Sequence, residues 1–309
     1  MSKFIFHHKR ANTVLLPALE AYEEERFLYK KWHANNGVAP QQVSIPCNIQ
    51  KSSVEHQVFL FFTTLITLQS VSDIGFRSCV EMYEGQGDIF SYEVLSMSIE
   101  DIATILKKYG INKPEQWAKY WYASAIFLFK ELQGQPLNLF NLFQTIDDYM
   151  VLKKRGELYL PGYGPKLMSL LTLFYEELAL IATIPDAIPV DVHHQRICIT
   201  TGIVTMRNPK EYSVNATLLA EFLRKNLAGW YIKMGNTPLN ASHSLFFLGS
   251  KACSRCERLR GLELYCPIAD HCSGGIPTRP YWKTGKWDLS LERKRKGHCQ
   301  KILNLGDLP

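Results

Sequence analysis

The pattern of apolar and polar positions along the chain predicts a protein made almost entirely of helices. Helical patterns separated by short turns cover residues 15–33, 52–68, 72–83, 98–109, 114–133, 141–154, 166–183 and 193–201. No segment shows strict apolar–polar alternation bounded by turns, which is the pattern of a half-buried strand. We therefore expect an all-α fold.

Two of the expected helices carry clear start signals. Ser52 is followed three residues later by Glu55, and this pair fits a capping box. Ser98 is followed by Glu100 and Asp101, whose negative charges suit the positive end of a helix dipole. That second helix should stop at the glycine at position 110.

The size and composition of the chain are those of a folded soluble protein. Its 309 residues suffice for one large domain or two modest ones, and 46% of them are hydrophobic and 21% charged. The longest apolar run, residues 58–68, contains threonines and is too short to cross a bilayer. The N-terminus shows no signal-peptide pattern. We expect a monomeric cytoplasmic protein with no membrane partner, located in the host cytoplasm if a phage encodes it.

The charge of the chain is compatible with a polyanionic partner. The formal net charge of +6 suits such a partner without requiring one. The most basic stretch, residues 293–296, is of a kind that is more often a solvated face than a specific site. It points to nucleic acid only beside independent evidence.

Four cysteines crowd into twenty positions near the C-terminus. Cys253, Cys256, Cys266 and Cys272 follow the spacing C-x2-C-x9-C-x5-C. Without an export signal, such clustering favours metal or cluster ligation over disulfides. Four thiolates can hold either an iron–sulfur cluster or a structural zinc ion.

The sharpest local feature is the sequence Leu-Pro-Gly-Tyr-Gly-Pro-Lys at residues 160–166, between two expected helices. Gly162 and Gly164 allow a tight turn and a close approach of backbone N–H groups to an external surface. The next helix presents its first amides and positive dipole end at the same place. This arrangement suits a DNA phosphate, although Gly-x-Gly turns also occur as plain connections between helices.

Several segments, in this order, resemble the helix-hairpin-helix DNA glycosylase superfamily and its endonuclease III-like members. Residues 160–166 resemble the family's Leu-Pro-Gly-x-Gly-x-Lys hairpin, in which the lysine is the Schiff-base nucleophile. Residues 190–196 resemble its Val-Asp-Thr-His-x-x-Arg segment, whose aspartate is essential. Residues 54–83 resemble its opening helix pair, with Gln69 where a glutamine fills the gap left by an extruded base. The likeness covers roughly residues 50–205.

The resemblance implies two catalytic residues and a DNA-contacting set. Cleavage of an N-glycosidic bond develops positive charge on the sugar, which the carboxylate of Asp191 can stabilise. The same carboxylate can deprotonate an attacking water or amine. The amine of Lys166 can attack the sugar carbon and form an imine that permits strand cleavage. The residues expected at DNA are Gln69, Gly162, Gly164, His193 and Arg196.

Plainer roles for the two catalytic candidates stay open. Asp191 also fits the N-cap of the helix at 193–201, a role that is compatible with catalysis. Lys166 can instead contact only phosphate, because some members of the superfamily with this hairpin lack lyase activity.

The cysteines extend the resemblance to a cluster loop. The segment from Cys266 to Cys272 matches the Cys-x5-Cys end of the glycosylase iron–sulfur loop. The family's usual spacing is C-x6-C-x2-C-x5-C, and the first spacings of this chain differ from it. The resemblance therefore implies a 4Fe-4S cluster, with structural zinc as the alternative.

The fold implied by the resemblance has two helical domains flanking a cleft. Residues 46–165 would form a helical barrel ending in the hairpin. Residues 1–45 and 166–309 would form the second domain, with the cysteine cluster and the basic tail. Lys166 and Asp191 would then face each other across the cleft.

Three functions follow from this comparison, all with double-stranded DNA as the partner. The first is a DNA glycosylase, with or without lyase activity, that acts in base excision on a flipped-out damaged or modified base. The second is a transferase of the same fold that attaches an amino acid or polyamine to activated 5-hydroxymethyluracil in phage DNA. The unusual cysteine spacing and the extra residues at 184–189 keep it open. The third is a DNA-binding protein without catalysis.

Overall fold

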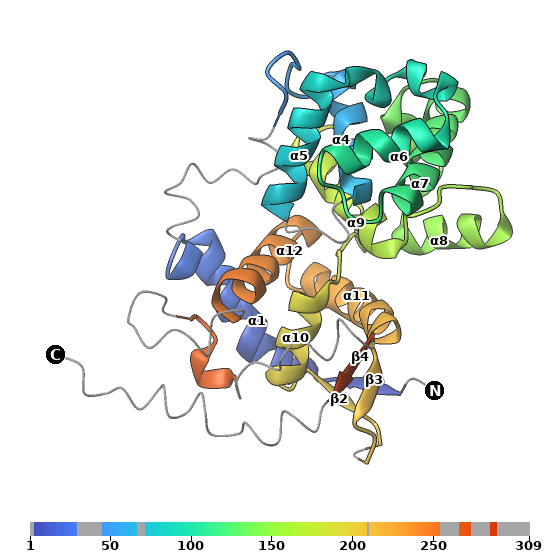
Figure 1. The fold of residues 1–309 in the computed structure, drawn as a ribbon. Coiled ribbons are helices and arrows are strands. Elements are labelled where there is room, and N and C mark those ends of the chain that lie inside the picture. The colour runs from blue at the N-terminus through green and yellow to red at the C-terminus, as the bar shows by residue number, and fades with distance from the viewer. Residues whose placement is uncertain are drawn as a thin grey trace. The chain divides into compact units, whose positions relative to one another are not determined.

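The computed structural model describes residues 3–29, 45–66, 72–208, 210–253, 266–272 and 285–288. Helices dominate these residues, and the strands among them are only three residues long, which confirms the expected all-α fold. The chain divides into two compact units. Unit 1 comprises Met1–Gly37 and Val190–Pro309, and unit 2 comprises Val38–Pro189. Their elements can be followed by label and colour in Figure 1.

Unit 2 is a bundle of helices around one almost fully buried helix, α4. Every residue of α4 from His56 to Ile66 is buried, which explains why this segment is apolar all round instead of on one face only. The helices of the unit are α4 (Val54–Ile66), α5 (Ser72–Gly85), α6 (Ile99–Lys108), α7 (Pro114–Ile126), α8 (Ile146–Arg155) and α9 (Pro165–Glu177). Shorter helical turns lie at Gly87–Phe90, Tyr92–Ser96, Phe127–Glu131 and Pro136–Asn141.

The helix starts follow the sequence signals in one case and differ by one residue in another. At α6 the side chains of Ser98 and Asp101 each bond the other's backbone N–H, which confirms the start expected there. At α4 the hydroxyl of Ser53 accepts the N–H of His56 at 3.2 Å. Ser52 instead adopts a left-handed backbone with φ of 68°. The cap of α4 is therefore Ser53 and not Ser52.

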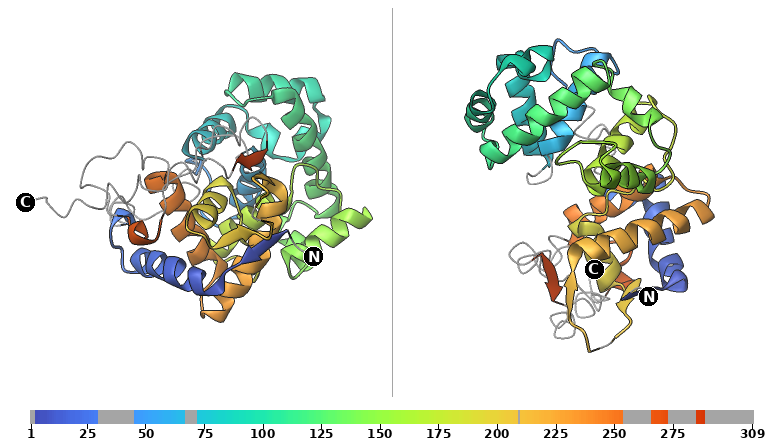
Figure 2. Two further views of the ribbon diagram at one scale, coloured as in Figure 1. Left: turned by 90° about the horizontal axis from the view of Figure 1, so that it is seen from below. Right: turned by 90° about the vertical axis from the view of Figure 1, so that its right-hand side faces the viewer.

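Unit 1 joins the start of the chain to its last third. Its helices are α1 (His8–Glu23), α10 (Val192–Thr200), α11 (Ala216–Lys233) and α12 (Pro238–Phe247), followed by short turns at Leu248–Cys253 and Ala269–His271. Helix α1 packs against α12. Strand β1 (Phe4–Phe6) pairs antiparallel with β2 (Val204–Met206), and β3 (Ser213–Asn215) with β4 (Lys286–Asp288). Both pairs are seen from other sides in Figure 2.

The division into units differs from the expected domain boundary at residue 165. Residues 166–189 lie in unit 2, because α9 packs against α4 and α8. The hydroxyl of Tyr175 donates to the carbonyl of Gln57 at 2.7 Å. The carboxylate of Asp186 accepts the N–H groups of Ile146 and Asp147, at 2.6 and 3.1 Å, and so caps the start of α8. The extra residues before Asp191 thus include a structural anchor for unit 2.

Within the described part of the chain, no helix is both long enough and apolar enough to cross a membrane.

Candidate functional site

The predicted hairpin connects α8 to α9, and its two glycines have different roles. Gly162 has a φ of +84°, and a Cβ there would lie 2.6 Å from Cδ1 of Leu65 and 3.2 Å from the ring of Tyr120. Only glycine fits this backbone without strain. Gly164 has an ordinary φ of −83° and is the N-cap of α9. A Cβ there would meet nothing within 4 Å, so this side of the turn is open.

Tyr163 fixes the hairpin to the core of unit 2. Its ring is fully buried and stacks on Phe61, with the ring centroids 5.4 Å apart. Its hydroxyl donates to the carbonyl of Phe61. Its own carbonyl accepts the hydroxyl of Tyr149, on α8, at 2.7 Å. The turn is therefore tied to both α4 and α8, which makes it a rigid element.

Lys153, in the last turn of α8, holds the hairpin from a second side. Its ammonium donates to the carbonyl of Leu160 at 2.7 Å and to that of Tyr163 at 2.5 Å. Burial lowers the pKa of this lysine from 10.5 to about 8. The sequence analysis did not identify Lys153, whose only signal was its place in a basic run before the hairpin.

Lys166 is the second residue of α9, directly after Pro165. Its side chain is half-buried, between a buried face of α9 and the surface. Its amine thus belongs to the first turn of a thirteen-residue helix that has no side-chain cap at Gly164. Lys166 lies in unit 2 and Asp191 in unit 1, so each is described within its own unit.

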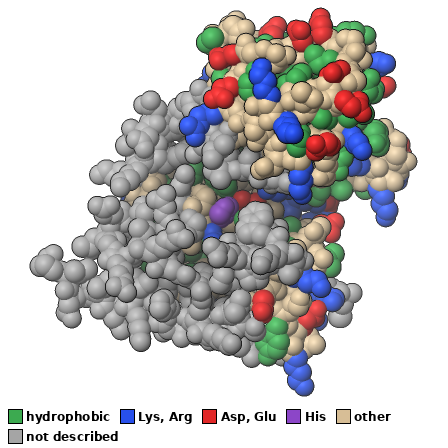
Figure 3. Space-filling view, in the orientation of Figure 1, with side chains coloured by type: hydrophobic (Ala, Val, Ile, Leu, Met, Phe, Trp, Pro, Cys, Tyr) green, Lys and Arg blue, Asp and Glu red, His purple; other side chains and the backbone are tan. Residues whose placement is uncertain are grey.

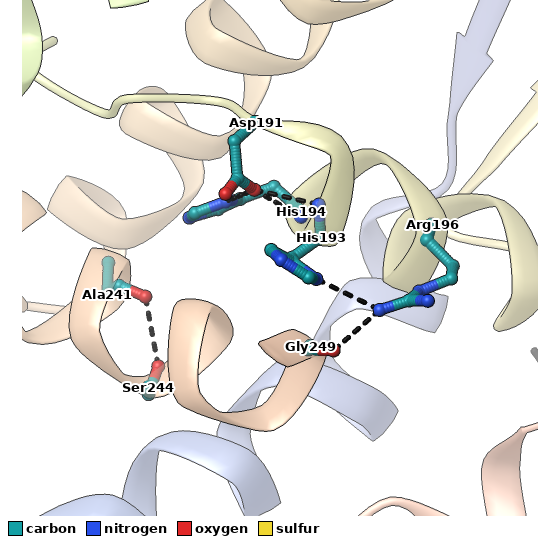
Figure 4. A network of polar contacts seen from close by, with 7 residues as sticks. All are labelled: Asp191, His193, His194, Arg196, Ala241, Ser244 and Gly249. Carbon is teal, nitrogen blue, oxygen red and sulfur yellow. Dashed lines mark hydrogen bonds and ion pairs between the residues drawn. The ribbon is translucent and has the colours of Figure 1, made fainter. Parts of the chain in front are cut away.

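Asp191 caps α10 and is held by three donors on one oxygen. Its Oδ1 accepts the backbone N–H groups of His193 and His194 at 2.8 and 3.0 Å, and lies 2.7 Å from Nδ1 of His194 (Figure 4). The Asp191 side chain is 11% exposed and that of His194 only 1%. The N-cap role is therefore real, and it orients the carboxylate.

His193 and Arg196 bond to each other and to the turn after α12. One nitrogen of the Arg196 guanidinium donates to Nδ1 of His193 at 2.9 Å and to the carbonyl of Gly249 at 2.5 Å (Figure 4). Arg196 is 4% exposed, so its guanidinium lies inside unit 1 and not at the surface where DNA contact was expected. A Cβ on Gly249 would come within 2.4 Å of Cβ of His193, so the two elements meet closely. Burial is the main cause that lowers the pKa of His193.

A residue near the end of the chain secures the middle of α10. The indole N–H of Trp287, on β4, donates to the side-chain oxygen of Gln195 at 2.7 Å. Both side chains are almost fully buried. The strand pair β3–β4 therefore braces the helix that Asp191 caps.

Three of the four clustered cysteines lie in the described part of unit 1. Cys253 ends the turn after α12, and Cys266 and Cys272 flank the turn at Ala269–His271. The pKa of the phenol of Tyr29 is raised by burial, then by the nearby thiols of Cys266 and Cys253. The sulfur of Cys272 lies 3.8 Å from Oγ1 of Thr200.

Arg10 fixes the cysteine segment to α10. It donates to the carbonyl of Thr201 at 2.6 Å and to that of His271 at 2.5 Å. Among the residues that the structure describes, no three metal-ligating side chains converge. Cys256 lies outside these residues, as does Gln69.

Comparisons with known proteins give one solved structure with a similar chain path. No family model matches the chain, and no curated protein does. The 8-oxoguanine DNA glycosylase of Methanocaldococcus jannaschii is 13% identical, with a TM-score of 0.49. The match covers 76% of this chain and 92% of that one.

The surface of unit 2 carries mixed charge. On the face seen in Figure 3, basic and acidic side chains are interspersed. Around the hairpin, Lys154 and Arg155 are exposed, and Arg155 lies 3.7 Å from the carboxylate of Glu157. Tyr159, just before the hairpin, is 72% exposed.

Proposed function

We propose that this protein is a DNA glycosylase that acts on a base flipped out of duplex DNA. The observation that supports it most is that two predicted motifs adopt the local structures their chemistry needs. The hairpin is a rigid turn between two helices, with Lys166 in the first turn of the second. Asp191 is a carboxylate held in one orientation at the start of α10. A non-catalytic connection would need neither.

In this proposal Asp191 supplies negative charge to the sugar from which the base departs. Three N–H groups converge on its Oδ1, so the carboxylate needs no reorganisation when positive charge develops. His193 and Arg196 act through α10 rather than by touching DNA, because they tie its first turn to Gly249.

Lys166 and the hairpin supply the second half of the site in this proposal. The amine of Lys166 attacks the sugar carbon as the base leaves, and the resulting imine permits strand cleavage by elimination. The backbone N–H groups near Gly162 and Gly164 approach a DNA phosphate, and Gln69 fills the gap left in the base stack.

We further propose that Cys253, Cys256, Cys266 and Cys272 hold a 4Fe-4S cluster. Soft thiolate donors suit iron–sulfur clusters and zinc alike. The segment that carries two of these cysteines is bonded to α10 through Arg10, so its role would be structural. Iron, sulfide and zinc analysis of the purified protein separates the two, and Cys266→Ser should lower the metal content and thermal stability together.

The activity is tested with a panel of duplexes carrying single modified bases. We expect release of one class of base, visible as abasic sites by mass spectrometry. Borohydride should trap a covalent complex with the wild-type protein and not with Lys166→Gln. Base release without trapping would restrict Lys166 to phosphate contact. A gain in mass on an intact glycosidic bond would instead identify the transferase, and binding without any change in the DNA would identify a non-catalytic protein.

A further inference from the structure

Lys153 carries a charge that its surroundings do not neutralise. The side chain is half-buried against the hairpin, and no carboxylate lies within ion-pair distance of its ammonium among the described residues. Burial is the cause that lowers its pKa to about 8. A cation in such a position gains from any anion that reaches it.

The geometry around Lys153 leaves one N–H for an external partner. An ammonium has three N–H groups, and the carbonyls of Leu160 and Tyr163 take two of them. The ring of Tyr149 lies 5.9 Å from the nitrogen and covers another side. The two carbonyls belong to the hairpin itself, so they hold the charge at the turn.

The surroundings of the turn favour a phosphodiester over a small free anion. Lys154 and Arg155 follow Lys153 in the chain and are exposed, and Tyr159 presents an exposed ring before the hairpin. A basic surface with an exposed aromatic side chain is typical of nucleic-acid contact. The open side of Gly164 allows a backbone to approach closely.

We propose that the ammonium of Lys153, held by the carbonyls of Leu160 and Tyr163, binds a backbone phosphate of duplex DNA at the hairpin. This inference rests on the proposed function, because it needs a DNA partner. It adds a specific cation to the site, where the sequence motif supplied only backbone N–H groups. In this account Lys153 both braces the turn and neutralises the phosphate.

The test separates the charge of Lys153 from its bracing role. Binding of an undamaged fluorescent duplex is measured by anisotropy over a range of salt concentrations, so catalysis is not needed. Lys153→Gln removes the charge but keeps two N–H donors for the two carbonyls, and Lys153→Met removes both. Lys107→Met is the matched control, because Lys107 is an exposed lysine on α6.

One phosphate contact contributes about 0.9 to the slope of log affinity against log salt, which is roughly eightfold in affinity at 0.1 M salt. We expect both Lys153 variants to lose about that much slope and affinity, and Lys107→Met to lose neither. A slope unchanged in Lys153→Gln would overturn the phosphate contact and leave only the brace. A wild-type protein that binds no duplex would overturn the proposed function as well.

A measurement on the wild-type protein guards against misfolded variants. The side-chain ammonium signal of Lys153, recorded by nitrogen-15 NMR at a pH below 8, should shift when the duplex is added. A signal that does not move while the duplex binds elsewhere would contradict the proposal.

Discussion

At the scale of single residues, the candidate site depends on close contacts that leave little room for substitution. Gly162 is the clearest example, because both its backbone conformation and its packing exclude a side chain. Gly164, two residues later, has neither constraint. The same short motif thus contains one structural glycine and one that keeps the surface open.

Gly162→Ala should destabilise unit 2 by about 2–4 kcal/mol, through left-handed backbone strain and overpacking against Leu65. Gly164→Ala, the matched control, should cost less than about 1 kcal/mol. Urea unfolding followed by circular dichroism measures both. Equal losses in the two variants would show that the turn is not built as described.

His193 makes stability depend on pH in a direction that can be stated. Burial lowers the pKa of its imidazole below the usual 6.5, so the unfolded chain binds more protons between those two pKa values. The contribution of His193 is therefore fully present above pH 6.5 and is lost as pH falls toward the folded pKa. His193→Gln should flatten this part of the pH profile of the unfolding free energy. His8→Gln, at an exposed histidine, should leave it unchanged.

At the scale of elements, α10 is held at both ends and in the middle by distant parts of unit 1. Its start bonds the turn after α12, its centre bonds Trp287 on β4, and its end accepts Arg10 from α1. A helix of nine residues has little stability alone. These contacts therefore decide the position of Asp191.

Trp287 offers a graded test of this bracing. Trp287→Phe keeps a ring but removes the N–H that Gln195 accepts, and should cost about 1 kcal/mol. Trp287→Ala also empties a fully buried position and should cost about 3–5 kcal/mol. Thermal unfolding measures both. If Trp287→Ala melts like the wild type, the strand pair does not support α10.

At the scale of the whole molecule, the sequence predicted what local signals encode. The capping residues of α6, the proline that starts α7 and the glycines of the hairpin each act over a few positions, and the structure has the helices they indicate. Helices α11 and α12 were missed, although Leu219, Leu223 and Leu227 recur at helical spacing on the buried face of α11.

Contacts between distant positions were not predictable in this way. The boundary between the units was expected at residue 165, and it falls at Pro189 because α9 packs on α4. The pairing of Trp287 with Gln195 spans 92 positions. The grip of Lys153 on the hairpin depends on how the turn folds back over α8. Periodicity cannot encode any of these, since each is created by tertiary packing.

The central claim is that Asp191 serves base excision, and Asp191→Asn tests it most directly. Asparagine is an equally good N-cap, so α10 should stay folded while the carboxylate charge is lost. With the duplex that the wild-type protein cleaves best, single-turnover base release should fall roughly a hundredfold or more, with an unchanged circular dichroism spectrum. Base release at the wild-type rate in a folded Asp191→Asn protein would contradict the account.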